Sequence, residues 1–155
     1  SFILTTLLIF PHLNFLPKET YLLEYGSPQP NFKEGYKIIK ELKKDSGIVI
    51  SPYTPLNKIY LNDIGFWLPI SLTGKENEIE NIAYEERDYY TGAPVIVNDE
   101  NLIEIINENS GFIIVDQMAK NRLGQTFNLI NNHEKTKIIF EEKAPKLGNL
   151  WIYKF

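Results

Sequence analysis

The chain has 155 residues, and its 16 lysines and arginines against 20 aspartates and glutamates give a formal net charge of -4. The length suits one domain with a sizeable core, and the acidic balance without a basic stripe argues against nucleic acid as a partner. Because the chain has no cysteine and only two histidines, a disulfide framework, a thiolate zinc site and a histidine-rich metal site are excluded. We therefore assign no metal ligand and no cofactor.

The N-terminal segment at residues 1–20 differs from the rest of the chain, because Lys18 is its first charged side chain. Its apolar start is shorter than the roughly 20 residues that a membrane span needs, and Pro11 would break a helix there. We expect this segment to be the end of a transmembrane helix or an apolar segment that packs on the core. Residues 21–155 are expected to form a single soluble α/β domain. Since the chain does not begin with Met, we also expect it to be a fragment.

The pattern from Asn31 onward predicts a helix. Asn31 and Glu34 resemble a capping box, the apolar residues that follow recur at helical spacing, and Gly47 ends the pattern. Residues 48–50 then predict a short buried strand.

The next two elements are a short helix and a strand. Thr54 and Pro55 predict the helix start, with Thr54 as the cap and Pro55 at the first helical position. The residues expected on its inner face are Leu56, Ile59 and Tyr60. Residues 64–70 predict a strand whose end Pro69 places at a sheet edge.

Residues 92–117 read as strand, helix and strand, and we expect the domain to be organised around them. Residues 93–97 form the first strand, which is apolar and rich in β-branched side chains. Asn98 or Asp99 caps the helix, whose apolar face consists of Leu102, Ile103, Ile105 and Ile106. Residues 112–115 form a second, continuously apolar strand, so the two strands are expected to be parallel neighbours in a covered sheet.

Asp116 follows this unit and can cap a further helix, whose inner face is expected to consist of Ala119, Leu123, Phe127 and Ile130. Residues 137–140 and 150–155 predict two closing strands that run antiparallel. This alternation of helices and strands predicts an α/β fold with a layered, mostly parallel sheet, helices on both faces and an antiparallel C-terminal edge.

Candidate ligand-binding residues lie in two places. Asp116 stands at the carboxyl end of a central strand, where such sheets bind ligands, although a helix N-cap is the simpler interpretation. The irregular stretch at residues 71–91 contains Arg87, Asp88, Tyr89 and Tyr90. This second group could hold a sugar or a lipid phosphate through the guanidinium and stacked rings, but local packing and an exposed ion pair explain it equally well.

Motifs of other functions are missing from the chain. No glycine-rich dinucleotide fingerprint follows the first strand, and there is no P-loop, nucleophile elbow or H-E-x-x-H sequence. A sheet core explains the pair Phe66 and Trp67 better than a sugar platform does. His133 is better explained by a helix C-terminus than by a base or a ligand. No catalytic residue is therefore assigned.

Three segments carry a resemblance to a known family: NFKEGYKIIKELKKDSGIVIS, YTGAPVIVNDENLIEIINENSGFIIVDQ and closing strands that end in LWIYKF. Their order resembles the soluble C-terminal domain of polytopic glycosyltransferases of the protein-mannosyltransferase-like (GT-C, family 39 type) group, which use dolichyl- or polyprenyl-phosphate sugars. The resemblance covers residues 31–155, and the apolar start is similar to the end of that family's last membrane helix. The catalytic acids of the family lie on loops between membrane helices, and no position here corresponds to them.

The resemblance implies a non-catalytic, membrane-anchored domain on the extracytoplasmic face that helps to bind the acceptor or the donor. Its partners would be the membrane-embedded portion of the same polypeptide and a sugar or lipid-linked sugar. The richness in Ile, Asn, Lys, Glu and Tyr is typical of an AT-rich genome, such as that of an archaeon. Two alternatives stay open: a free-standing small-ligand or sugar-binding α/β module, and a small hydrolase that uses Asp88 or Asp116.

Overall fold

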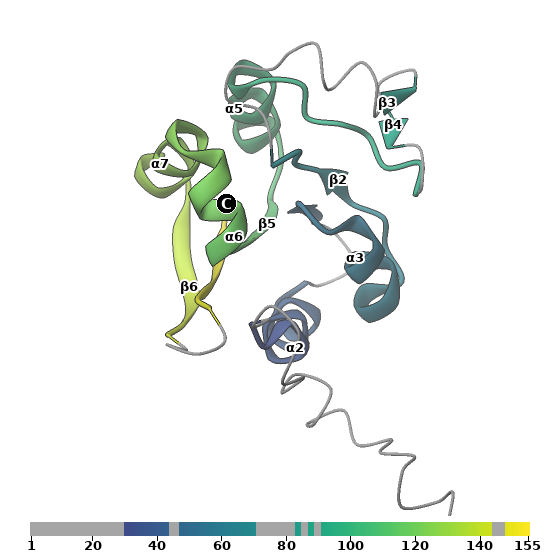
Figure 1. Cartoon of the computed structure of the whole chain (residues 1–155), viewed down its shortest axis with the longest axis vertical. Helices are drawn as coiled ribbons and strands as arrows, with labels where there is room; N and C mark the ends of the chain where they lie inside the picture. Colours follow the sequence, from purple (N-terminus) through teal and green to yellow (C-terminus); the bar gives the residue numbers. More distant parts are fainter. Residues whose placement is uncertain (1–29, 44–46, 71–82, 85–86, 89–90, 144–147) are drawn as a thin grey trace, which may run out of the picture.

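A computed structural model of the chain describes residues 30–43, 47–70, 83–84, 87–88, 91–143 and 148–155 (Figure 1). Its helices are α2 (Phe32–Leu42), α3 (Thr54–Leu61), α5 (Asp99–Glu108), α6 (Gln117–Leu123) and α7 (Gln125–Asn132). Its strands are β1 (Ile48–Ser51), β2 (Phe66–Trp67), β3 (Ala83–Tyr84), β4 (Arg87–Asp88), β5 (Gly111–Asp116), β6 (Lys137–Glu142) and β7 (Leu150–Lys154). These elements confirm the α/β class.

The main sheet has five strands in the order β2-β1-β5-β7-β6. β1 pairs in parallel with β2 and β5, whereas β7 pairs antiparallel with β5 and β6. The expectation of a mostly parallel sheet is therefore corrected to a mixed sheet. The physical reason is that residues 150–153 of β7 are all buried, so this strand takes an interior place beside β5 and contributes two antiparallel pairings.

Residues 93–97, predicted to be a strand next to β5, instead run along β2. Val95 forms a parallel bridge with Trp67, the Trp67 amide donates to the Pro94 carbonyl at 2.8 Å, and the Ile96 amide donates to the Trp67 carbonyl at 2.9 Å. β2 and β1 lie between this segment and β5, so the prediction of parallel neighbours is wrong. Pro94 has no amide hydrogen to donate to a ladder, which favours a place at the sheet edge.

Side chains alternate along β5 between two hydrophobic clusters. Ile113 and Val115 belong to one cluster, which also contains the buried apolar residues of α5, α6 and α7. Phe112 and Ile114 belong to the other cluster, which contains the buried apolar residues of α2 and half-buried residues of α3. Because successive residues of a strand point to opposite faces, the two clusters lie on the two sides of the sheet.

The helix that follows β1 differs from its prediction in two respects. Tyr53 rather than Thr54 occupies the N-cap position of α3, and the Thr54 hydroxyl donates to Asp88 instead of capping the helix. Ile59, which was expected on the inner face, is 71% exposed, whereas Thr54 and Asn57 are buried. Both buried polar side chains have hydrogen-bond partners inside the domain, which is what makes their burial possible.

The single helix predicted after Asp116 is two helices, α6 and α7. They meet at Gly124, whose φ of 55° and ψ of −108° fit a glycine far better than any other residue. The four residues expected on the inner face are nevertheless all buried: Ala119, Leu123, Phe127 and Ile130. Their near-helical spacing continues across the break, which explains why the pattern did not reveal it.

The predicted end of a transmembrane helix at residues 1–20 lies outside the described residues. Within the described ranges, no helix combines the length and the apolar character needed to cross a membrane.

Candidate functional site at the carboxyl edge of the sheet

The parallel strands β1 and β5 end at the same edge of the sheet. From β1 the chain continues through α3 to β2 on one side, and from β5 it continues through α6 and α7 toward β6 on the other side. The place where the connections diverge in this way is the switch point of the sheet, and open α/β sheets commonly bind ligands there. Ser51, Tyr53 and Asp116 lie at this point.

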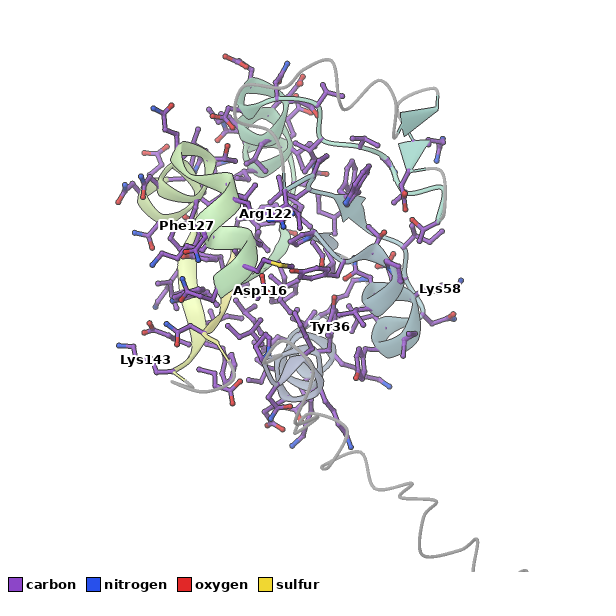
Figure 2. The ribbon with its side chains drawn as sticks, in the orientation of Figure 1. Tyr36, Lys58, Asp116, Arg122, Phe127 and Lys143 are labelled. Carbon is purple, nitrogen blue, oxygen red and sulfur yellow. The ribbon has the colours of Figure 1, made fainter. Side chains whose placement is uncertain are left out.

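Tyr53 and Asp116 join the two strand ends. The Tyr53 hydroxyl donates toward both carboxylate oxygens of Asp116, at 3.1 Å each. The same carboxylate accepts from the Ala119 amide at 2.7 Å. Asp116 lies where α6 begins (Figure 2). The interpretation of Asp116 as a helix N-cap is thus confirmed. Its bond with Tyr53 was not predicted.

The environment of this pair changes both pKa values. Burial raises the pKa of the Asp116 carboxyl, although the hydrogen bonds from Ala119 and Tyr53 oppose the rise. Burial also raises the pKa of the Tyr53 hydroxyl, and the adjacent Asp116 charge raises it further. At neutral pH the phenol is therefore protonated and acts as the donor.

A second polar cluster lies behind β1 and was not predicted. The Tyr36 hydroxyl donates to Asn57 Oδ1 at 2.6 Å and lies 3.5 Å from Ser51 Oγ. The Asn57 amide group donates to the Ile64 carbonyl at 3.0 Å. All three side chains are buried, so their hydrogen bonds fix α2 and α3 against β1.

Asp88 is buried beside the start of α3 and anchors the end of the long loop. Its Oδ2 accepts from the Thr54 hydroxyl at 3.2 Å, from the Thr91 amide at 3.1 Å and from the Thr91 hydroxyl. The Asp88 amide donates to the Ala93 carbonyl at 2.8 Å. These bonds tie the loop to α3, as the local-packing interpretation of this residue predicts.

The candidate residues that the structure describes do not all lie around one point. Arg87 is exposed and donates to the Gly92 carbonyl at 3.0 Å. Tyr89 and Tyr90 lie outside the described residues. Asp116 bonds with the turn after β1 and with α6 rather than with this loop. Arg87 and Asp88 therefore belong to the loop anchor, and Asp116 belongs to the switch point.

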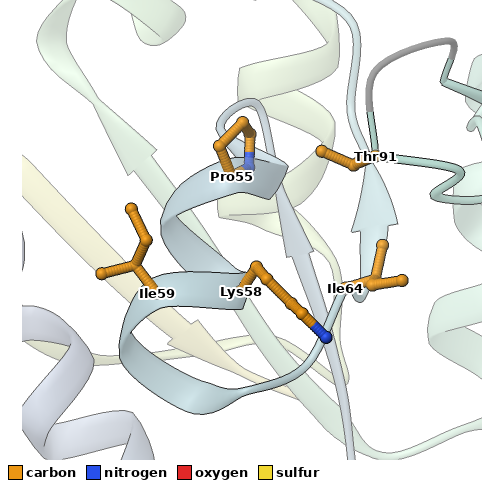
Figure 3. A pocket seen from close by; sticks show the side chains of 5 residues that line it. All are labelled: Pro55, Lys58, Ile59, Ile64 and Thr91. Carbon is orange, nitrogen blue, oxygen red and sulfur yellow. The ribbon is translucent and has the colours of Figure 1, made fainter.

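A pocket of about 410 Å³ lies next to the loop anchor (Figure 3). Its lining residues are Pro55, Lys58, Ile59, Ile64 and Thr91. Three of the five are apolar, Lys58 supplies a positive charge, and Thr91 supplies a hydroxyl oxygen. Small-molecule sites typically have volumes of roughly 300–1,000 Å³ and apolar walls with a few polar groups. The sequence did not reveal this pocket, because its pattern placed Ile59 in the core.

Comparison with other proteins adds no family assignment. No protein-family model, no curated protein and no solved structure matches the chain. Over the ranges that the structure describes, no group of three or more His, Asp or Glu side chains could hold a metal ion. The family resemblance stays a prediction. The pocket and the neighbouring hydrogen bonds of Asp88 are the structural features from which a function can be proposed.

Proposed function

We propose that the chain is an extracytoplasmic accessory domain of a membrane glycosyltransferase that uses a polyprenyl-phosphate sugar. The domain helps to bind the donor or the acceptor, while catalysis belongs to the membrane-embedded portion of the same polypeptide. The observation that carries the proposal is the pocket of about 410 Å³ on α3, next to the loop that contains Arg87 and Asp88.

The lining of the pocket suits a ligand with an apolar chain and an anionic group. Pro55, Ile59 and Ile64 offer apolar surface, and Ile59 is 71% exposed. Covering that surface with an isoprenoid chain stabilises the complex by about 25 cal/mol per Å² removed from water. Lys58 can pair with a phosphate as a point charge. The Thr91 hydroxyl donates to Asp88 and its oxygen accepts from the Ala93 amide at 3.4 Å, so Thr91 joins the edge of the pocket to the anchored loop.

The two buried carboxylates support a binding role rather than a catalytic one. Asp88 accepts three hydrogen bonds from Thr54 and Thr91. Asp116 accepts from Tyr53 and Ala119. A general acid or base must reach the substrate proton that it transfers, so a hydrolase that used either carboxylate would have to release these structural bonds.

The test is a titration of the chain with a short-chain prenyl phosphate, followed by amide NMR shifts and by melting temperature. We expect shifts in α3 and at Thr91, and stabilisation of about 2.7 kcal/mol at a ligand concentration of 100 times Kd. Lys58→Gln should weaken binding about tenfold, as the loss of one charge-assisted contact implies. Lys37→Gln, on the exposed side of α2, is the matched control. The proposal would be contradicted if the amide shifts occurred outside α3 and Thr91, or if Lys58→Gln and Lys37→Gln weakened binding equally.

The same pocket favours a second candidate, a free-standing small-ligand or sugar-binding module. This candidate predicts that a sugar or sugar phosphate without a prenyl chain binds as tightly as the prenyl phosphate. It also predicts that replacing Ile59 by serine leaves that affinity unchanged. The accessory-domain proposal predicts that the prenyl phosphate binds more tightly than the sugar without a prenyl chain. It also predicts that Ile59→Ser weakens binding of the prenyl phosphate, because the apolar chain supplies much of the binding free energy.

A further inference from the structure

β6 presents an exposed edge of the main sheet. It is the outermost strand, β7 pairs with one side of it, and no other strand of the described part of the chain pairs with it. Its residues are exposed or half-buried, in contrast to β5, and Ile138 is 42% exposed. The free side of such a strand is a template for pairing with another chain.

The charges along β6 make this edge complementary to itself. Lys137 stands at one end and Glu142 at the other, and the residues between them are Ile138, Ile139, Phe140 and Glu141. In an antiparallel pair related by a two-fold axis, Lys137 of each copy lies opposite Glu142 of the other copy. In the same register Ile138 lies opposite Glu141, and Ile139 lies opposite Phe140. Opposite charges at directly facing positions stabilise a strand pair, whereas like charges destabilise it. A parallel pair would place Lys137 beside Lys137.

The irregularity in β6 makes this register possible. Residues directly opposite one another in antiparallel strands point to the same face of the sheet. In a regular strand, residues 139 and 140 would point to opposite faces. The register shift between Ile138 and Phe140 instead lets both Ile139 and Phe140 pack against the cluster of α2. The ladder partners of Lys137 and Glu142 are residues 154 and 150, so these two side chains share a face as well.

We propose that two copies of this chain associate through β6 in an antiparallel, two-fold arrangement that pairs Lys137 with Glu142 of the second copy. The same surface is used by both copies, so the contact closes after two chains and does not propagate into a fibre. Charged ends and an irregularity protect an edge strand against indiscriminate pairing. In β6 the same features are compatible with the antiparallel register that places Lys137 opposite Glu142. The inference does not depend on the proposed function.

Sedimentation of the full chain over micromolar to millimolar concentrations tests the association. We expect the molar mass to rise from one chain to two. Lys137→Glu and Glu142→Lys should each weaken the dimer at least about fivefold, because each creates like-charge pairs, and the double variant should return to within about twofold of the original. Glu142 also accepts a hydrogen bond from the Asn31 amide, and both Glu142→Lys and the double variant lose this bond. Recovery of the dimer in the double variant would therefore show that the pairing of residues 137 and 142, and not the bond to Asn31, sets the dimer affinity. Lys33→Glu, on α2, is the control for net charge.

A second measurement tests the register. Because the chain has no cysteine, Lys137→Cys and Glu142→Cys chains can be mixed and oxidised without competing thiols. We expect a crosslinked pair that contains one chain of each kind. Lys137→Cys alone should not crosslink, since its two copies would lie roughly 17 Å apart along the strands. A single chain at every concentration, failure of the double charge variant to recover, or equal crosslinking by Lys137→Cys alone would overturn the proposal.

Discussion

The Tyr53 hydroxyl donates to both carboxylate oxygens of Asp116, at 3.1 Å each. Asp116 also caps α6 through the Ala119 amide, so one carboxylate holds the turn after β1 and the start of α6 together. At the switch point of the sheet, the Asp116 carboxylate is therefore hydrogen-bonded by groups of the protein itself. The pocket on α3 lies next to a different anchor, the one built on Asp88.

We expect Tyr53→Phe to lower the free energy of unfolding by about 1.5–3 kcal/mol, as is usual for a hydrogen bond to a charged group. The ring keeps its edge contact with Phe32, at 5.4 Å between centroids, so the change isolates the hydroxyl. Urea denaturation measures the loss. Asp116→Asn keeps a cap acceptor and should cost less than Asp116→Ala. Equal stability of Tyr53→Phe and the original chain would show that the contact contributes nothing.

The pKa of the Asp116 carboxyl should lie above the ordinary value of about 3.9, because burial disfavours its ionised form. Tyr53→Phe should raise this pKa further, since the lost hydrogen bond favours ionisation. A raised folded-state pKa contributes stability that is fully present below the unfolded pKa and is lost as pH rises through the folded pKa. A carbon NMR titration of the Asp116 carboxyl reports the midpoint directly. A midpoint at or below about 3.9 is the contrary result.

Asp63 should show the opposite pH dependence. Burial works against its ionisation, but hydrogen bonds from the Lys43 side chain and the Gly65 amide outweigh burial and hold its pKa below the ordinary value. The stability from a lowered pKa is present above the unfolded pKa and is lost as pH falls through the folded pKa. Lys43→Met should therefore flatten the acid dependence of urea unfolding below about pH 4. Lys40→Met, in the last turn of α2, serves as the control and should leave that dependence intact.

Gly65 and Gly92 form a matched pair for testing backbone packing. Both have positive φ, at 65° and 71°. A Cβ on Gly65 would stand 2.2 Å from the Val49 carbonyl oxygen, whereas a Cβ on Gly92 would meet nothing within 4 Å. We expect Gly92→Ala to cost about 1–2 kcal/mol for its backbone conformation and Gly65→Ala to cost at least about 3 kcal/mol. Equal losses in thermal unfolding would argue against the close approach of Gly65 to β1.

The local spacing of apolar residues predicted those helices and strands whose structure depends mainly on their own sequence. Of the four residues predicted on the apolar face of α5, Leu102, Ile105 and Ile106 are buried and Ile103 is half-buried. Asn98, one of the two cap candidates, caps that helix through the Asn101 amide at 2.8 Å. Strand order could not be read in this way. Residues 93–97 and β5 have similar apolar runs, and only the packing of the whole sheet decides which of them lies at the centre.

The candidate site was predictable to the same limited degree. The position of Asp116 between a strand and a helix indicated its cap role, but its bond to Tyr53 joins residues 63 positions apart. Ile59 was assigned to the core because its spacing is helical. In the folded chain Thr54 and Asn57 occupy the inner positions through hydrogen bonds, and Ile59 lines the pocket instead. Polar burial of this kind leaves no apolar pattern to detect.

The central claim, that this domain serves a membrane-embedded glycosyltransferase, is tested most directly by sugar transfer in membranes that contain the product of the complete reading frame. The donor is a polyprenyl-phosphate sugar, and transfer is compared with and without residues 30–155. The account predicts transfer that weakens when this domain is removed and that persists in folded Asp88→Asn and Asp116→Asn variants. A product that transfers no sugar, or transfer abolished by either substitution in a folded protein, would contradict it.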